Sequence, residues 1–212
     1  YYHFKKEVGQ KQKENALQLP KDNETIGELR GIFAGDGSFY HRNTGHYRIE
    51  TTLNYQENYW RKLAEFFEEK LGKSPHIHHE EKYSRTRIRY YSKPLYEMLK
   101  KHLFWEKGAK SQTIQLKSRD KEHSFMKGFI RGLIDTDGYK EKKFRRYIYG
   151  SISKKLRDDF SDGLNALEIE HTNYSEEAVK EDWKTMYKTR LSGDAADKFR
   201  RKIRPRHPKK RQ

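Results

Sequence analysis

Residues 28–39 read ELRGIFAGDGSF, and residues 129–140 read FIRGLIDTDGYK. Both stretches show an apolar helical pattern that ends in Asp-Gly, and the two aspartates, Asp36 and Asp137, lie 101 residues apart. Glycine suits the left-handed residue that ends many helices, so each motif predicts a helix that stops at its aspartate, with Gly37 and Gly138 in that conformation. The chain of 212 residues is therefore predicted to be an internal repeat.

The segments after the two motifs repeat as well. In each, a Tyr-rich strand region precedes an amphipathic helix, a second pair of strands and a short helix, which predicts two α-β-β-α-β-β-α repeats with antiparallel strands. We expect an extension at 1–23, a first repeat at 24–118, a linker at 119–121, and a second repeat with a basic tail at 122–212. Because the linker is short, the repeats are expected to pack as one α+β body with pseudo-twofold symmetry.

The composition points to a polyanionic partner. Lys and Arg number 47 against 31 Asp and Glu, a formal charge of +16. Nucleic acid is the first candidate, since each phosphate contact releases counterions; an anionic membrane is the second, but no apolar run reaches the length of a span. The absence of cysteine excludes disulfides and thiolate zinc sites and fits an intracellular protein, whether in cytoplasm, organelle or nucleus.

Small residues recur at every fourth position in both motif helices. They are Gly27, Gly31 and Gly35 in the first helix and Ser124, Gly128, Gly132 and Thr136 in the second. Positions four apart share a helix face, and each internal glycine costs about 0.5–1 kcal/mol relative to alanine. Such stripes predict that the two helix backbones touch.

Parallel pairing of these helices would bring Asp36 and Asp137 together. Two adjacent carboxylates repel each other, and a helix C-terminus disfavours anions, so a divalent cation with oxygen ligands is expected between them. Asp135 is a third nearby acid, but Ala34 stands at the matching position of the first repeat. Asp135 is therefore outside the symmetric pair.

The segments LRGIFAGDG (29–37) and IRGLIDTDG (130–138) resemble the LAGLIDADG motif of homing endonucleases. The resemblance spans nearly the whole chain and is closest to the monomeric, two-motif, intron-encoded members. It implies two antiparallel sheets that form a saddle on double-stranded DNA, with the motif helices at the centre. It also implies Mg²⁺-dependent hydrolysis of both strands across the minor groove, leaving short 3′ overhangs, with Ca²⁺ or Mn²⁺ able to replace Mg²⁺.

The resemblance also implies roles for particular residues. Asp36 and Asp137 would be the metal ligands, together with the backbone carbonyls of Gly35 and Thr136. The other catalytic candidates are Gln56 after the second strand, either Lys107 or Lys110 and either Lys209 or Lys210 beyond the third helices, and Lys140; of these alternatives we favour Lys107 and Lys209. A solvated charge or a phosphate contact remains the alternative for each lysine. Arg30 and Arg131 replace the small second residue of the motif and are expected to point away from the helix contact.

Alternating strands suggest a polar sheet face that binds DNA. The residues expected there are Tyr40, Arg42, His46, Arg48, Glu50, Thr52, Asn54, Arg85, Arg87, Arg89, Lys142, Arg145, Arg146, Lys184, Lys188 and Arg190. A solvated face would also be polar. The row Arg85, Arg87 and Arg89 has a single sign, however, and would repel itself without an anion, which favours DNA.

The main alternative is a non-cleaving nucleic-acid-binding protein of the same fold, either an intron RNA maturase or a transcription regulator. A pure binder has no use for two facing carboxylates, which repel the phosphates it binds. The intact acid pair therefore favours an endonuclease, and two motifs in one chain favour a monomer.

Overall fold

A computed structural model describes residues 17–42, 45–54, 58–117, 122–178, 180 and 183–211, with the side chain of Lys142 excepted. Gln56, the linker at 119–121 and most of the N-terminal extension lie outside the described residues. The predicted boundaries of the extension, the repeats and the linker therefore stay predictions. No helix in the described ranges combines the length and apolarity needed to cross a membrane.

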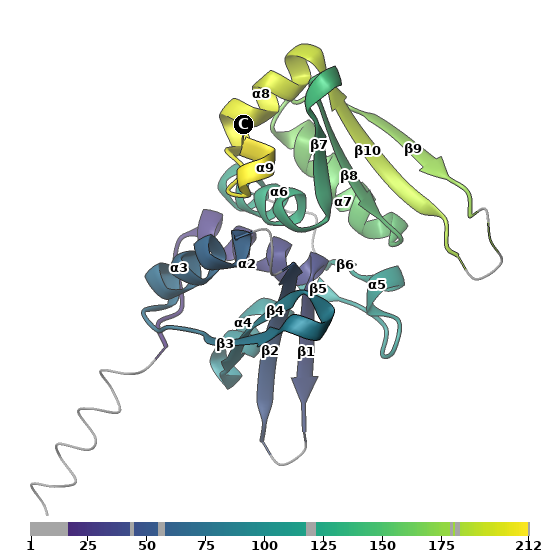
Figure 1. The fold of residues 1–212 in the computed structure, drawn as a ribbon. Coiled ribbons are helices and arrows are strands. Elements are labelled where there is room, and N and C mark those ends of the chain that lie inside the picture. Colours follow the sequence, from purple (N-terminus) through teal and green to yellow (C-terminus); the bar gives the residue numbers. More distant parts are fainter. Residues whose placement is uncertain are drawn as a thin grey trace, which may run out of the picture.

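The two halves have the same order of main elements (Figure 1). The first half contains α2 (Asn23–Gly35), β1 (Gly37–His41), β2 (Tyr47–Asn54), α3 (Tyr59–Leu71), β3 (His76–Glu80), β4 (Arg85–Tyr91) and α4 (Lys93–Lys100). The second contains α6 (His123–Asp137), β7 (Gly138–Glu141), β8 (Arg146–Ser151), α7 (Lys154–Ala166), β9 (Thr172–Glu176), β10 (Met186–Ser192) and α8 (Gly193–Ile203). The predicted α+β repeat is thus confirmed.

Each half builds one antiparallel sheet of four strands. The strand orders are β1-β2-β4-β3 and β7-β8-β10-β9, so the two sheets have the same topology. The sheets lie on opposite sides of the central pair α2 and α6 (Figure 1). The strands leave this pair directly, because β1 and β7 begin at the glycine that follows each motif aspartate.

A short segment follows the third helix of each half, and the sequence did not predict its helices or strands. After α4 come β5 (Leu103–Phe104), α5 (Lys110–Thr113) and β6 (Gln115–Leu116). After α8 comes α9 (Pro208–Arg211). They are too short for a hydrophobic period to reveal them.

Helix ends follow local side-chain chemistry. Asp22 caps α2 by accepting a hydrogen bond from the Thr25 amide at 2.8 Å. Ser153 caps α7 in the same way at Leu156, over 3.2 Å. Gly72 ends α3 in the left-handed conformation, with φ 63°. These signals fix where the helices begin and end.

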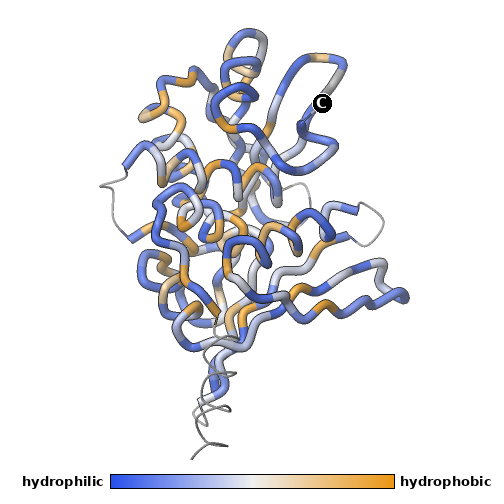
Figure 2. The backbone as a smooth tube through the Cα atoms, turned by 90° about the vertical axis from the view of Figure 1, so that its left-hand side faces the viewer, coloured by the Kyte–Doolittle hydropathy of each residue, from blue (hydrophilic) through white to orange (hydrophobic). Residues whose placement is uncertain are grey.

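The apolar residues form two cores, one in each half. The first is centred on Phe33, Phe67 and Ile88, and the second on Phe129 and Tyr149. The second core also takes in residues that follow α4 in the first half, namely Leu103, Ile114 and Leu116. Apolar stretches run through the middle of the molecule, and the outer loops are mainly hydrophilic (Figure 2). The chain segment after α4 therefore belongs structurally to the opposite half.

The central helices touch through their backbones, as the small-residue stripes predicted. A Cβ atom added at Gly31 would lie 2.2 Å from the Phe129 carbonyl oxygen, and one at Gly132 would lie 2.4 Å from that of Glu28. Such distances are far inside van der Waals contact. Any larger side chain at either glycine must push the helices apart.

Glycine is required at positions 37 and 138 for a different reason from the one predicted. Neither has a positive φ; Gly138 is extended, with φ −90° and ψ 164°. A Cβ at Gly37 would lie 2.4 Å from the Phe33 carbonyl oxygen, and one at Gly138 would lie 2.7 Å from that of Ile134. The prediction of a left-handed end was wrong: glycine is needed because the strand turns back tightly over its own helix.

Candidate active site

Asp36 and Asp137 stand at adjacent helix ends. Asp36 is the residue that caps α2, and Asp137 is the last residue of α6. A Cβ at Gly35 would lie 2.5 Å from Asp137 Oδ2, so the second carboxylate packs against the end of the first helix. The parallel pairing of the motifs therefore brings both acids into one centre.

The environment of the pair disfavours two negative charges. Burial raises the pKa of Asp36, against the attraction of Lys210 and Lys110. Burial, and then the charge of Asp36, raises the pKa of Asp137 to about 7. Burial also lowers the pKa of Lys110 to about 8. A cation placed between the acids would relieve this repulsion and desolvation.

Two lysines reach the carbonyl groups that precede the acids. Lys110 Nζ donates to the carbonyl oxygens of Ala34 and Gly35, over 2.8 and 3.2 Å. In the second half, Lys210 Nζ donates to those of Asp135 and Thr136, over 2.7 and 3.3 Å. These contacts are equivalent by the pseudo-twofold symmetry. Each helix end thus presents a carboxylate, two carbonyl oxygens and an ammonium group in a small volume.

Each lysine-bearing segment packs on the opposite half. The segment that carries Lys110 is held by α7, where Asp159 accepts the Leu116 amide at 2.6 Å and Ser153 Oγ donates to the Ile114 carbonyl at 2.7 Å. The segment that carries Lys210 is held by the first half through the α3 side chains Tyr59 and Phe66 and the α2 residue Glu28. Because each segment crosses to the opposite half, both lysines lie at the junction between the halves.

The C-terminal segment makes aromatic and ionic contacts with the first half. The His207 ring lies 4.5 Å from that of Tyr59, and the Arg206 guanidinium lies 4.3 Å from the Phe66 ring centroid. Arg206 also pairs with the buried carboxylate of Glu28. The segment is therefore fixed to the first half, although it belongs to the second repeat.

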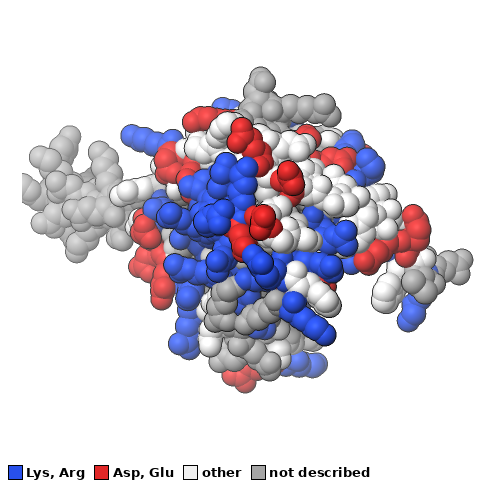
Figure 3. Space-filling view, turned by 90° about the horizontal axis from the view of Figure 1, so that it is seen from above, with Lys and Arg blue, Asp and Glu red and all other residues white. Residues whose placement is uncertain are grey.

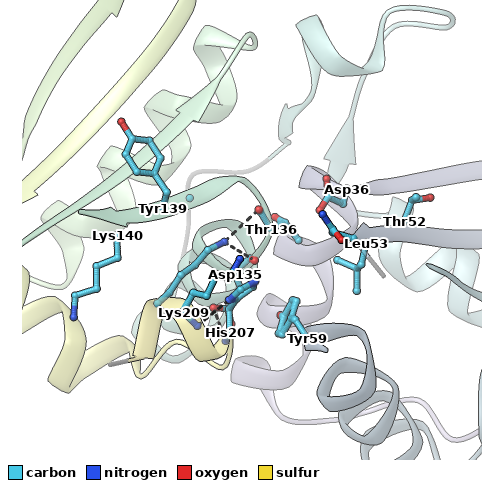
Figure 4. A pocket seen from close by; sticks show the side chains of 13 residues that line it. Asp36, Thr52, Leu53, Tyr59, Asp135, Thr136, Tyr139, Lys140, His207 and Lys209 are labelled. Carbon is cyan, nitrogen blue, oxygen red and sulfur yellow. Dashed lines mark hydrogen bonds between the residues drawn. The ribbon is translucent and has the colours of Figure 1, made fainter. Parts of the chain in front are cut away.

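The other predicted catalytic residues lie at varying distance from the acids. Lys107 is exposed in the turn before α5, and Lys209 is exposed on α9, where its amide donates to His207 Nδ1 at 3.2 Å. Lys140 extends from β7 towards α9, away from Asp36 (Figure 4), with its Nζ 5.2 Å from the Tyr147 ring. Between the alternatives left open by the sequence, the geometry favours Lys110 and Lys210.

A pocket of about 490 Å³ opens beside Asp36 (Figure 4). Its lining is polar and is drawn from both halves: Asp36, Thr52, Leu53, Asn54, Tyr59, Asp135, Thr136, Gly138, Tyr139, Lys140, His207, Lys209 and Lys210. The Tyr59 hydroxyl is buried there without a hydrogen-bond partner among the described residues. Neither Tyr59 nor His207 was predicted from the sequence, because both are far from the motifs and they meet only where the C-terminal segment packs on the first half.

The oxygen atoms at the centre fit a hard divalent cation. Among the described residues, no three His, Asp or Glu side chains form a metal-binding group. The ligand set would instead be two carboxylates with the carbonyl oxygens of Gly35 and Thr136, and a hard cation such as Mg²⁺ keeps several waters beside one or two carboxylates. The residues present are therefore suited to Mg²⁺.

The arginine row of the first sheet is not a bare positive stripe. Arg87 pairs with Glu50 at 3.3 Å and with Glu80 at 2.6 Å; Arg89 also pairs with Glu50, and Arg85 with Glu80. The premise that the row repels itself without an external anion was wrong, because acids on neighbouring strands separate the charges. Glu50 is buried in these ion pairs. The register still places the three arginines on the face opposite the core.

The other residues predicted for the first sheet lie on β1 and β2 or next to them. Tyr40 is exposed and lies under the guanidinium groups of Arg42 and Arg48, 5.5 and 5.0 Å from its ring centroid. Exposed His46 lies at one end of β2, and Thr52 and Asn54 near the other end line the pocket at Asp36. Of these residues, Thr52 and Asn54 therefore lie nearest the acid pair.

In the second sheet the predicted cations have separate partners and form no continuous row. Lys188 pairs with Glu176 at 2.6 Å, Arg146 with Glu141 at 3.8 Å, and Arg190 lies 5.8 Å from the Tyr174 ring. Lys184 is exposed, and the side chain of Lys142 lies outside the described residues. Arg145 pairs with Asp197 on α8. This pairing draws Arg145 away from the sheet face where it was predicted.

Lys and Arg side chains cluster on one face of the molecule (Figure 3). The face seen from above in Figure 3 carries a large patch of Lys and Arg. Arg200, Arg201 and Lys202 are exposed in the last turn of α8. Cations there also favour the helix itself, because they oppose its dipole.

The comparisons agree with the repeat and its motifs. Residues 124–204 match the family model of the LAGLIDADG-like domain. None of the curated proteins matches the chain. The fold is that of the homing endonuclease I-DmoI: a structure of its mesophilic variants aligns with a TM-score of 0.62 and 21% identity over 85% of this chain and 95% of that one.

Two further solved structures share the fold. I-DmoI in complex with DNA and Ca aligns with a TM-score of 0.59 and 21% identity over 86% of this chain and 91% of that one. Full-length DUF199/WhiA from Thermatoga maritima aligns with a TM-score of 0.59 and 14% identity over 88% of this chain and 57% of that one. The resemblance to the monomeric, two-motif LAGLIDADG homing endonucleases is therefore confirmed.

Proposed function

We propose that this protein is a site-specific endonuclease that cuts both strands of DNA with the help of divalent metal ions. The observation that carries the proposal is the pair of buried carboxylates, Asp36 and Asp137, at the touching ends of two helices. No packing need explains two acids there, since burial and mutual repulsion disfavour both charges. The similarity in fold to a homing endonuclease solved with DNA and metal supports the same conclusion.

The acids and the preceding carbonyls would hold Mg²⁺, or Mn²⁺ in its place, and the bound ion would supply an activated water and charge stabilisation at the phosphate. Lys110 and Lys210 lie against the same carbonyl groups. Their ammonium groups would neutralise charge that develops on the scissile phosphate of each strand. The pocket beside Asp36 gives room for a phosphate and water at one of the two positions.

The two sheets would bind the duplex as a saddle. The arginine row of the first sheet and Lys188 and Arg190 of the second face away from the cores. Arginine can read guanine in the major groove, while the acids would meet the phosphates across the minor groove. Each arginine of the first-sheet row keeps an acidic neighbour, which orients its guanidinium before DNA binds. We propose cleavage with short 3′ overhangs by a single copy of the chain.

A non-cleaving DNA- or RNA-binding protein is the second candidate. The observation that favours it is the fold itself, which is shared with DUF199/WhiA, a protein not named as an endonuclease. Fold alone therefore does not establish cleavage. The acid pair with its two lysines is the feature that a binder does not need.

Selection of cut sites from a randomised DNA library with Mg²⁺ tests the proposal. Wild-type protein should enrich one family of sites and leave 3′ overhangs on sequenced ends. The matched controls are Asp36→Asn and Asp137→Asn, which should enrich nothing by cutting. Tight, sequence-specific binding of wild-type protein without any cut product, in Mg²⁺ or Mn²⁺, would favour the second candidate.

A further inference from the structure

Asp135 is a buried acid that the paired-aspartate site leaves without a role. Its side chain lies on α6 and is 2% exposed. Oδ2 accepts the Arg206 amide at 2.8 Å, and Oδ1 accepts the His207 amide at 3.1 Å. Both carboxylate oxygens are thus used to hold the backbone of the C-terminal segment against the motif helix.

This anchor stands directly before Lys210. The His207 carbonyl accepts the amides of Lys210 and Arg211, at 2.9 and 3.0 Å, so a rigid turn follows the anchored amides. Lys210 Nζ then returns to the Asp135 and Thr136 carbonyls. The Tyr147 hydroxyl donates to the Lys210 carbonyl at 2.6 Å and holds the turn from the sheet side. The segment thus contacts the C-terminal end of α6 twice, through the two anchored amides and through Lys210; Figure 4 shows Asp135 beside His207.

The first half places its lysine without such an acid. Ala34 occupies the position that matches Asp135, and the segment carrying Lys110 is anchored from α7 by Asp159 and Ser153. Removing the Asp135 carboxylate should therefore loosen Lys210 and leave Lys110 in place. Because only one of the two lysines depends on Asp135, a single substitution at Asp135 tests the role of Lys210 separately from that of Lys110.

We propose that Asp135 is the positioning residue for Lys210, and that without its carboxylate the enzyme cuts one DNA strand and only slowly the other. The proposal rests on the proposed nuclease function. Because each lysine lies at its own helix end, each would serve one scissile phosphate. Asp135→Ala reproduces the residue that the first half carries, and it is therefore the substitution least foreign to this fold.

Strand-specific cleavage of the library-selected site, labelled on either strand, is the first test. Asp135→Ala should slow one strand at least tenfold, change the other less than threefold, and make nicked DNA accumulate. Lys210→Met should slow the same strand. The matched control Asp162→Ala removes an exposed acid of α7 and should cut both strands at the wild-type rate. Equal slowing of both strands by Asp135→Ala would overturn the proposal.

The double variant Asp135→Ala/Lys210→Met separates positioning from general damage. If Asp135 acts through Lys210, the double variant should cut within twofold of Lys210→Met alone. Multiplied losses would show that Asp135 acts by another route and would overturn the proposal. Asp135→Asn, which keeps one acceptor oxygen, should fall between Asp135→Ala and wild type.

Amide hydrogen exchange tests the anchor without relying on cleavage. Asp135→Ala should raise exchange at Arg206 and His207 at least tenfold and leave the α5 amides unchanged, whereas Asp162→Ala should change neither. Unchanged exchange at Arg206 and His207 would overturn the proposal even in an active nuclease. If wild-type protein cuts no DNA, the proposed function fails, and the exchange result still decides whether Asp135 holds this segment.

Discussion

The two motif helices carry arginine at matching positions, yet the two side chains meet opposite surroundings. Arg131 donates to Glu28 at 2.8 Å and to Glu24 at 2.5 Å, and both acids belong to the partner helix. Arg30 donates to the Met98 carbonyl of its own half at 2.9 Å, its guanidinium lies 5.5 Å from the Phe125 ring centroid, and its buried Nε has no partner among the described residues. The expectation that both arginines point away from the helix contact was wrong: each reaches across it.

The difference shows how a repeat becomes asymmetric while its catalytic centre stays symmetric. Glu24 and Glu28 of α2 correspond to Phe125 and Phe129 of α6. One side of the helix pair is therefore ionic and the other aromatic. The ionic side also holds Arg206 and, through it, the segment that carries Lys210. The aromatic side has no such segment to hold.

The largest expected effect contrasts these two arginines. Arg131→Met should destabilise the protein by about 3–5 kcal/mol, because it leaves the buried Glu28 with less compensation. Arg30→Met is the matched control and should change stability by less than about 1 kcal/mol. It loses the hydrogen bond to the Met98 carbonyl, but it also removes an unsatisfied Nε donor and a charge whose pKa burial lowers to about 10. Urea unfolding measures both. If both variants lost the same free energy of unfolding, Glu24 and Glu28 would not be the reason that the two arginines differ.

The second prediction contrasts the two lysines. Lys110→Met and Lys210→Met should each slow cleavage by about 10²–10³-fold on one strand, because each removes a preorganised cation near a phosphate. The affected strands should be opposite. Single-turnover cleavage of doubly labelled DNA with saturating Mg²⁺ measures this, and Lys107→Met is the exposed control. If both variants cut the same strand more slowly, the assignment of one lysine to each cleavage site is contradicted.

The third prediction concerns the contact that the halves share. Gly31→Ala and Gly132→Ala should each cost about 1–3 kcal/mol, because a Cβ at either site meets partner backbone that cannot move aside. Gly150→Ala is the control, since its nearest neighbours would be 3.4 Å away and belong to side chains. Thermal unfolding separates them. Greater stability in the Gly31 and Gly132 variants would mean that the helices are not in contact.

The smallest expected effect is a pH dependence that the acids impose. Burial raises the folded-state pKa of Asp137 to about 7 and that of Asp135 to about 6, above the ordinary value near 4. The folded state therefore holds these protons more tightly, and stability present below pH 4 should be lost as the pH rises through 7. Stability without metal is therefore expected to fall between pH 5 and pH 8.

Saturating Mg²⁺ should shrink that loss, because the ion binds the ionised acids of the folded state. Asp137→Asn should also reduce it, since the amide does not titrate. Melting curves at pH 5, 6, 7 and 8, with Mg²⁺ or EDTA, measure the effect. Stability that rises over this range in EDTA would contradict the direction of both pKa shifts.

The sequence predicted the parts of the fold that have a period. Glycine every fourth residue gave the helix contact, and alternation in 46–54 gave the polar sheet face. The Asp-Gly repeat also indicated which acids to pair. These features depend on one stretch of chain at a time, so their signal is local.

The sequence did not predict contacts between segments that lack a period. The choice between Lys107 and Lys110 depended on where a four-residue helix docks on α7, and Lys210 depends on a carboxylate 75 residues earlier. The arginine row looked single-signed because Glu50 and Glu80 lie on other strands. Such contacts are set by strand register and by the crossing segments, and residue spacing does not record them.

Cleavage by the two aspartate variants tests the central claim most directly. A plasmid carrying the library-selected site should be linearised by wild-type protein in Mg²⁺. Asp36→Asn and Asp137→Asn should each cut that plasmid at least about 10³-fold more slowly while binding the site with wild-type affinity, because the acids would hold metal rather than DNA. Cleavage by both variants at the wild-type rate would contradict the claim that this acid pair is the catalytic centre.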